Sequence, residues 1–251
     1  MDYEALSQDL VKWIKDWFVS HGNKKAIIGM SGGAKSYIVA TALVRALGKS
    51  GVIGIVMRDD RDAELDKGGI HACEYFGMEY YTLPVFPAIN AIKNVLNLEC
   101  KIPITETTVH CLPTRIRMSC LYAIAESKNG LVVNTNCLSD FYIGNAIQYG
   151  DSAGDVSPFG FLTVTEMRKI GMELGLSEKL AYINPDSCLP GSKPDEDYFG
   201  FRYFVLDNYI RTGDCLSLQI SNKIDELAKK SKFRDISLDA FNPNLPIYRN
   251  E

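Results

Sequence analysis

The residues best suited to chemistry form a glycine loop, SGG at 31–33, that stands between a buried strand and a helix. The apolar run KAIIGM at 25–30 predicts the strand. The stretch KSYIVATALVRAL at 35–47 predicts the helix, which Gly48 closes. Glycines let the backbone approach a ligand, and the start of a helix offers N–H groups and a positive dipole end. The unit is therefore suited to binding a phosphate.

Two common phosphate-binding motifs do not fit this loop. In the Walker motif G-x-x-x-x-G-K-[ST] the lysine directly follows the second glycine, whereas here Ala34 separates Gly33 from Lys35. The G-x-G-x-x-G pattern of dinucleotide-binding folds cannot be laid over residues 29–36 either. From the residues alone, a tight strand-to-helix turn without a ligand stays open as the alternative to a phosphate site.

Further along the chain, predicted strands alternate with predicted helices. Strands are indicated at 51–57, 78–83 and 130–135, and helices at 4–18, 62–76, 84–98, 114–128, 163–174, 196–210 and 217–230. Because this alternation requires parallel pairing with right-handed crossovers, we predict an α/β fold with a doubly wound parallel sheet and helices on both faces. We expect one domain over 1–251, with an N-terminal helix within 1–20 and a candidate mobile loop at 184–196.

Composition excludes several other kinds of protein. The 27 Lys and Arg residues against 31 Asp and Glu residues leave a net charge of -4, which argues against a nucleic-acid or anionic-membrane partner. The sequence has no apolar stretch of membrane-spanning length, and acids interrupt the beginning of the chain, unlike a signal peptide. The seven cysteines never form a C-x-x-C pair, so we expect a reduced, cytoplasmic protein.

The loop and five downstream segments together resemble one known family. The text IGMSGGAKS is similar to the S-G-G-x-D-S pyrophosphate loop of the ATP pyrophosphatases. The segments TRIRMSCLYAIA, LVVNTNCLSDFYIG, YGDSAGDVSPF, TVTEMRKIGMELGL and PDEDYFGFRYFVLDNYIRTG resemble the ammonia-dependent NAD synthetases, and they occur in the family's order. One short motif is weak evidence, whereas five collinear segments indicate homology over most of the chain.

The resemblance implies an ATP-pyrophosphatase-type fold and an amide ligase. In this family ATP adenylates the nicotinate carboxylate of deamido-NAD, pyrophosphate leaves, and ammonia then displaces AMP to form NAD. The implied cofactors are ATP and Mg2+, the implied partners are deamido-NAD and ammonia, and the implied assembly is a homodimer. Two alternatives stay open, namely a degenerate nucleotide-binding homologue without NAD synthesis and a related ATP pyrophosphatase acting on another carboxylate or carbonyl.

The resemblance also assigns roles to individual residues. Lys35 and Asp140 are the candidate catalytic residues, and Asp140 stands where the family has a magnesium-binding glutamate. The residues that would contact ATP are Ser31, Gly32, Gly33, Ser36, Met57, Thr135 and Asp186. Those that would contact deamido-NAD are Arg115, Gln148, Asp155 and Arg234. Apart from the resemblance, an arginine on a helix is an ordinary solvated or ion-paired residue, and an aspartate in a glycine-rich loop caps a turn.

The chain departs from the family pattern where the chemistry would take place. Lys35 replaces the loop aspartate that ligates magnesium, and a cation is not a magnesium ligand. Asp140 is one methylene shorter than the family's glutamate, while Gln148 and Val164 each stand where members of the family carry a lysine. We therefore expect the protein to turn over slowly or not at all.

Two roles of Lys35 are consistent with the sequence. In the first, its ammonium group replaces part of the metal charge and binds the β- and γ-phosphates of ATP directly. In the second, the ammonium forms an ion pair with Asp140 and neutralises a former metal site. Of the two, retained nucleotide binding with impaired turnover is the expectation.

Overall fold

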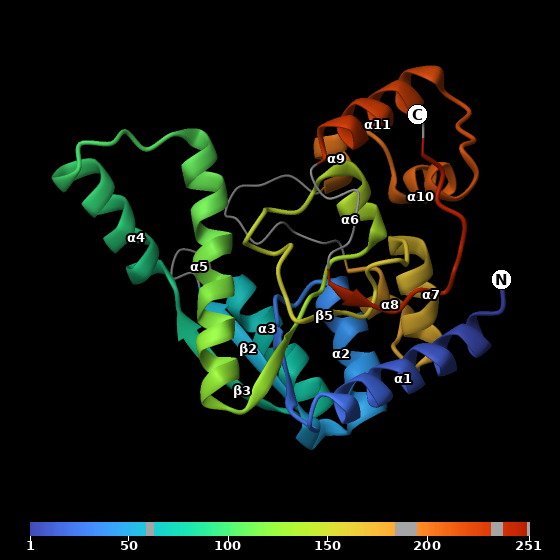
Figure 1. Cartoon of the computed structure of the whole chain (residues 1–251), viewed down its shortest axis with the longest axis horizontal. Coiled ribbons are helices and arrows are strands. Elements are labelled where there is room, and N and C mark those ends of the chain that lie inside the picture. The colour runs from blue at the N-terminus through green and yellow to red at the C-terminus, as the bar shows by residue number, and fades with distance from the viewer. Residues whose placement is uncertain (59–62, 184–194, 232–237, 250–251) are drawn as a thin grey trace.

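Six parallel strands in the order β3-β2-β1-β4-β5-β6 form the central sheet of the computed structural model (Figure 1). The strands are β1 (Lys25–Gly29), β2 (Val52–Arg58), β3 (Glu79–Pro84), β4 (Gly130–Val133), β5 (Val156–Ser157) and β6 (Asp239–Ala240). The structure describes residues 1–58, 63–183, 195–231 and 238–249. The strand order reverses direction between β1 and β4, which is the topology of a doubly wound sheet. The predicted fold class is confirmed.

Helices cover both faces of this sheet. The α-helices are α1 (Tyr3–Ser20), α2 (Ala34–Leu47), α3 (Ala63–Phe76), α4 (Phe86–Asn94), α5 (Glu106–Ser127), α6 (Leu138–Ile143), α7 (Val164–Glu173), α8 (Glu178–Ala181), α9 (Asp195–Phe199), α10 (Tyr203–Thr212) and α11 (Leu218–Lys230). A 3-10 turn, η1 (Lys49–Gly51), follows α2, and a π-helical turn, η2 (Val95–Glu99), follows α4.

Alternate residues of β1 show how the two faces are filled. Ala26 and Ile28 belong to the larger core, which α1, α2, α3 and α7 cover. Ile27 packs on the opposite face, in a smaller cluster with Met118 and Leu121 of α5. Because successive side chains of a strand point to opposite faces, a strand that is apolar throughout must be covered on both sides. This explains why the apolar run at 25–30 forms an interior strand.

The observed helices differ from the predicted ones in several places. The short helices α6 and α8 are not predicted, and the end of the helix expected at 84–98 is the π-helical turn η2. The helix expected at 114–128 begins earlier, because the Thr105 side chain caps it by accepting a hydrogen bond from the Thr108 N–H, and Pro113 lies inside the helix. The helix expected at 196–210 is divided into α9 and α10 at Gly200, whose φ of 74° ends a right-handed helix. Within the described residues, no helix is long and apolar enough to cross a membrane.

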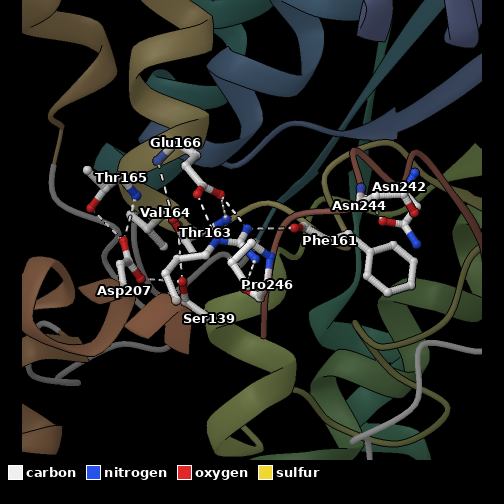
Figure 2. A network of polar contacts seen from close by, with 11 residues as sticks. Ser139, Phe161, Thr163, Val164, Thr165, Glu166, Asp207, Asn242, Asn244 and Pro246 are labelled. Carbon is white, nitrogen blue, oxygen red and sulfur yellow. Dashed lines mark hydrogen bonds and ion pairs between the residues drawn. The ribbon is translucent and has the colours of Figure 1, made fainter. Parts of the chain in front are cut away.

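The C-terminal segment is held against the domain by Arg211 of α10. Its guanidinium group donates to both oxygens of Glu166 on α7, from Nε at 2.8 Å and from Nη2 at 2.7 Å. The same group donates to the carbonyl oxygens of Phe161 and Pro246, which Figure 2 shows next to Glu166. Arg211 therefore joins α7, α10 and the end of the chain, and so supports the helices that lie around the candidate site.

Candidate active site

The glycine loop and the start of α6 lie at the point where the strand order reverses. Residues 30–33 lead from β1 into α2, and residues 134–137 lead from β4 into α6. In open α/β sheets, ligands bind in the crevice at the carboxyl ends of the strands at such a point. The topology therefore places the candidate site between the first turns of α2 and α6.

Lys35 and Asp140 form an ion pair across this point. Lys35 Nζ lies 2.6 Å from Asp140 Oδ1, with the Asp140 side chain fully buried and the Lys35 side chain 18% exposed. Burial by itself lowers the pKa of Lys35, but the neighbouring negative charges, with Asp140 foremost, outweigh it and raise this pKa above its ordinary value. The ammonium group is therefore charged at neutral pH. This geometry corresponds to the second of the two roles considered for Lys35.

The carboxylate of Asp140 is fully engaged by its neighbours. Oδ1 accepts from Lys35 Nζ and, at 3.4 Å, from Asn145 Nδ2. Oδ2 accepts from the Cys137 main-chain N–H at 3.0 Å and from the Cys137 thiol at 3.2 Å. Since each carboxylate oxygen offers about two lone-pair positions, these four donors leave none for a metal ion. Nor do the described residues contain a group of three or more His, Cys, Asp or Glu side chains that could hold one. This arrangement does not fit a resident Mg2+.

Two residues of the C-terminal helices also face Lys35. Lys35 Nζ lies 5.8 Å from the ring centroid of Tyr203, and the Tyr203 hydroxyl donates to Asp195 Oδ2 at 2.7 Å. Burial raises the pKa of Asp195, although the charge of Lys35 acts in the opposite direction. Sequence reasoning did not single out Asp195, Tyr203 or Asn145. The first two lie within a segment quoted for the family resemblance, but nothing in their spacing relates them to Lys35.

The glycine loop has a close-packed conformation that requires glycine. Gly32 has a φ of 81°, and a Cβ atom there would lie 2.5 Å from the carbonyl carbon of Gly68 on α3. Ser31 Oγ accepts from the Gly33 N–H at 3.2 Å, and Ser36 Oγ donates to the Gly33 carbonyl at 2.8 Å. Gly33 is the N-cap of α2 and has no side chain that could accept a hydrogen bond from the first turn, so this turn keeps N–H groups for an anion.

A network of buried polar groups positions α6 behind Asp140. Figure 2 shows Asp207 of α10 facing Ser139 of α6 and Thr165 of α7. Ser139 Oγ donates to Asp207 Oδ1 at 2.6 Å, and the main-chain N–H and hydroxyl of Thr165 donate to Asp207 Oδ2. The Val164 N–H donates to Ser139 Oγ at 3.0 Å. Because Ser139 precedes Asp140 directly, this network holds the first turn of α6 in place.

The remaining residues assigned to ATP are Thr135, Met57 and Asp186, which lie in separate segments of the chain. Thr135 is half-buried in the turn after β4, next to the first turn of α6. Met57 lies near the end of β2 and packs on the face that α5 covers. Asp186 lies outside the described residues, as do Arg234 and positions 184–194 of the predicted mobile loop. Their assignments stay predictions.

The structure brings together two of the residues assigned to deamido-NAD. Arg115, exposed on α5, donates from Nε to the main-chain carbonyl of Gln148 at 3.1 Å. Asp155 has a different partner, because its Oδ2 accepts from the Val132 N–H of β4 at 2.7 Å. Asp155 thus fastens its own loop to β4 through a long-range contact with the main chain. This contact is compatible with a further role in ligand binding, which stays a prediction.

The loop that carries Gln148 and Asp155 is fastened to the end of β4. Asn134 Nδ2 donates to the carbonyl oxygens of Asp151 and Ala153, at 2.6 and 2.7 Å, and Asn136 Nδ2 donates to Asp151 at 3.0 Å. The two asparagines flank Thr135, so the ATP and dinucleotide candidates share one support. Sequence reasoning did not identify these asparagines, although LVVNTNCLSDFYIG was among the quoted segments.

Fold and site together define a doubly wound α/β protein with a glycine loop at the point where the strand order reverses, and comparison with known proteins gives the family. A model of the NAD synthase family matches residues 6–237, and the chain belongs to that family. The NH(3)-dependent NAD(+) synthetase of Pyrococcus horikoshii is 29% identical, over 93% of each chain. That of Thermococcus sibiricus is 32% identical, over 90% of this chain and 87% of the relative. The family's members are ligases.

Solved structures with the same fold include two that cover nearly all of this chain. An NMN synthetase from Francisella tularensis has a TM-score of 0.83 and 24% identity, over 98% of this chain and 100% of its own. An NH3-dependent NAD synthetase from Campylobacter jejuni has a TM-score of 0.72 and 23% identity, over 93% and 96%. At these identities the likeness concerns the fold.

Proposed function

We propose that this protein is an ammonia-using, ATP-dependent amide ligase that converts deamido-NAD to NAD at a low rate. The observation that carries the proposal is the glycine loop at the start of α2, next to Asp140, in a chain that the family model matches from 6 to 237. The departures from the family pattern at Lys35 and Gln148 support a low rate, because each changes the charge of a side chain that would lie next to the substrates.

In the proposed reaction, a carboxylate oxygen of the nicotinate group attacks the α-phosphorus of ATP, and pyrophosphate leaves. Ammonia then attacks the acyl carbon, AMP leaves with the carboxylate oxygen, and the nitrogen loses one proton to yield the amide. The N–H groups at the start of α2, with Ser31 and Ser36, hold the phosphates. Arg115, Gln148 and Asp155 hold the dinucleotide. Mg2+ enters this proposal as the counter-ion of the substrate ATP.

We further propose that the protein acts as a homodimer. Exposed apolar side chains occur on α4, on η2, in the connection that follows η2 and at the beginning of α5, and Figure 1 shows α4 and α5 at one side of the molecule. They are Ile92, Val95, Leu98, Ile102 and Val109. An apolar surface of this kind favours self-association through a symmetric interface. Light scattering should therefore give a dimer mass, and Leu98→Glu combined with Val109→Glu should give a monomer.

The net charge of -4 argues against nucleic acids and anionic membranes as partners of this protein. We propose a cytoplasmic protein whose partners are the small-molecule substrates and a second copy of the chain. Measuring retention on a heparin column and sedimentation with anionic vesicles tests this directly. Retention or sedimentation at physiological salt would contradict it.

The deciding experiment measures NAD and AMP formed from ATP, Mg2+, ammonia and deamido-NAD. Nicotinate mononucleotide serves as a second substrate arm, because the Francisella tularensis neighbour is an NMN synthetase. Equal amounts of AMP and NAD support the proposal. Amide formed only from the mononucleotide would identify the alternative substrate, and ATP binding without AMP release would identify the degenerate homologue.

A further inference from the structure

Among the residues that the structure describes, the cation that pairs with the buried carboxylate of Asp140 is the ammonium group of Lys35. The pair is almost closed to solvent, and its 2.6 Å separation makes it a charge-assisted hydrogen bond. The other three donors to this carboxylate are a main-chain N–H, a thiol and an amide, none of which carries charge. A buried carboxylate without a counter-charge is strongly unfavourable, so Lys35 supplies the counter-charge that Asp140 needs in this position.

Lys35 also joins two parts of the fold that a metal ion could otherwise join. It belongs to the first turn of α2, after β1, whereas Asp140 belongs to the first turn of α6, after β4. Two carboxylates with a dication carry zero net charge, and so does one carboxylate with an ammonium group. The Lys35–Asp140 pair therefore has the same zero net charge as a divalent metal ion held between two carboxylates. Tyr203 and Asp195 enclose the ammonium from a third direction, on the C-terminal helices.

We infer that the ammonium group of Lys35 is the resident cation of this site, linking α2 to α6 where a divalent metal would otherwise lie, so that the protein without nucleotide binds no metal there. The inference concerns the protein without substrates and does not rest on the proposed reaction. Lys35 is on this view a positioning residue. This role of Lys35 replaces the expectation that Asp140 is a magnesium ligand. A resident lysine predicts no metal binding at the site, whereas a magnesium ligand predicts metal binding there.

Thermal unfolding in EDTA and in millimolar Mg2+ tests the inference on the full chain. The natural protein should show the same midpoint in both buffers. Lys35→Asp places a second carboxylate beside that of Asp140, with the carboxylate of Asp195 near both, so its midpoint should fall in EDTA and rise by about 5 °C or more when Mg2+ saturates the new site. Lys35→Met removes the cation without adding a ligand, so Mg2+ should restore much less of its midpoint. Lys12→Met, which breaks the exposed Lys12–Asp16 pair, is the surface control.

Titration with Mn2+, followed by the electron paramagnetic resonance of the free ion, gives a second and independent measurement. The natural protein and its Asp140→Asn variant should bind the same amount of Mn2+, whereas Lys35→Asp should bind one additional ion. Mn2+ binding by the natural protein that Asp140→Asn abolishes would overturn the inference. So would a Lys35→Asp protein that folds equally well in EDTA and in Mg2+. If Lys35→Asp does not fold in either buffer, the comparison of the natural protein with Asp140→Asn decides.

Discussion

Lys35 and Asp140, 105 positions apart in the sequence, meet at 2.6 Å and join the first turn of α2 to the first turn of α6. The pKa of Lys35 is raised above its ordinary value, so the ammonium keeps its charge, and the stability that the pair contributes, until the pH rises through that raised pKa. The pair is therefore intact throughout the physiological range. A lysine held in this way differs from a solvated loop lysine, because a phosphate must compete with Asp140 for it.

The first prediction concerns turnover. We expect the natural protein to release AMP more slowly than the roughly 1–10 per second that is ordinary for enzymes. Lys35→Asp combined with Asp140→Glu restores the acidic pair of the family pattern and should raise the rate at least about tenfold, equivalent to about 1.4 kcal/mol of barrier. Chromatographic measurement of AMP checks this. If the natural protein is fast and the double variant slow, Lys35 itself stabilises the leaving pyrophosphate.

The second prediction concerns the close approach of Gly32 to α3. Gly32→Ala adds a Cβ atom 2.5 Å from the Gly68 carbonyl carbon, at a φ of 81°. Gly22→Ala is the matched control, because Gly22 has a φ of 82° with nothing within 4 Å of its Cβ position. Both variants should lose about 1–2 kcal/mol to backbone strain, and Gly32→Ala should lose a further 1–3 kcal/mol or so by overpacking.

Urea denaturation measures the two free energies of unfolding. ATP affinity, measured by calorimetry, should fall for Gly32→Ala and stay unchanged for Gly22→Ala, because only Gly32 lies in the proposed phosphate loop. Equal losses of stability in the two variants would show that the loop moves away from α3 without cost.

The third prediction concerns dinucleotide binding. Replacing Arg115 by Ala should weaken the binding of deamido-NAD by about 1.5–3 kcal/mol, the usual range for losing a hydrogen bond to a charged group. Arg45→Ala is the control, because Arg45 is another helical arginine whose Nε donates to a main-chain carbonyl, that of Leu174. Calorimetric titration of both variants separates a ligand contact from a structural one. An unchanged affinity in a folded Arg115→Ala protein would leave Arg115 an ordinary surface residue.

The fourth prediction concerns thiol reactivity. Burial raises the pKa of Cys73 to about 12, and it raises the pKa of Cys137 well above its ordinary value, with the charge of Asp140 adding to the effect. With a pKa of about 12, roughly one Cys73 thiol in ten thousand is ionised at pH 8, and only the thiolate reacts. Iodoacetamide should therefore modify the exposed Cys100 and leave these two cysteines intact.

Mass spectrometry of the alkylated protein checks this prediction residue by residue. Unfolding in guanidinium chloride should make all seven cysteines reactive, which controls for reagent and digestion. Alkylation of Cys137 in the native protein as fast as that of Cys100 would show that the thiol does not hold its hydrogen bond to Asp140.

The local pattern of the sequence determined most of the elements and the place of the phosphate loop. Apolar runs such as 25–30 predicted buried strands, and the 3.6-residue repeat predicted the long helices, because both signals lie within a few neighbouring residues. The strand, glycine loop and helix at 25–47 are likewise contiguous in the chain. Short elements were not predicted, since the two-residue strands β5 and β6 depend on pairing with distant neighbours.

Only the tertiary structure decided how Lys35 is used. The sequence allowed its ammonium to bind phosphate or to pair with Asp140, because the composition of a loop does not determine which distant charge faces it. The sheet order places β1 beside β4, and that neighbourhood brings the two residues together. The same holds for Asp195 and Tyr203, which reach the site from helices far along the chain. Contacts between distant segments depend on strand pairing and helix packing, which single-sequence patterns do not specify.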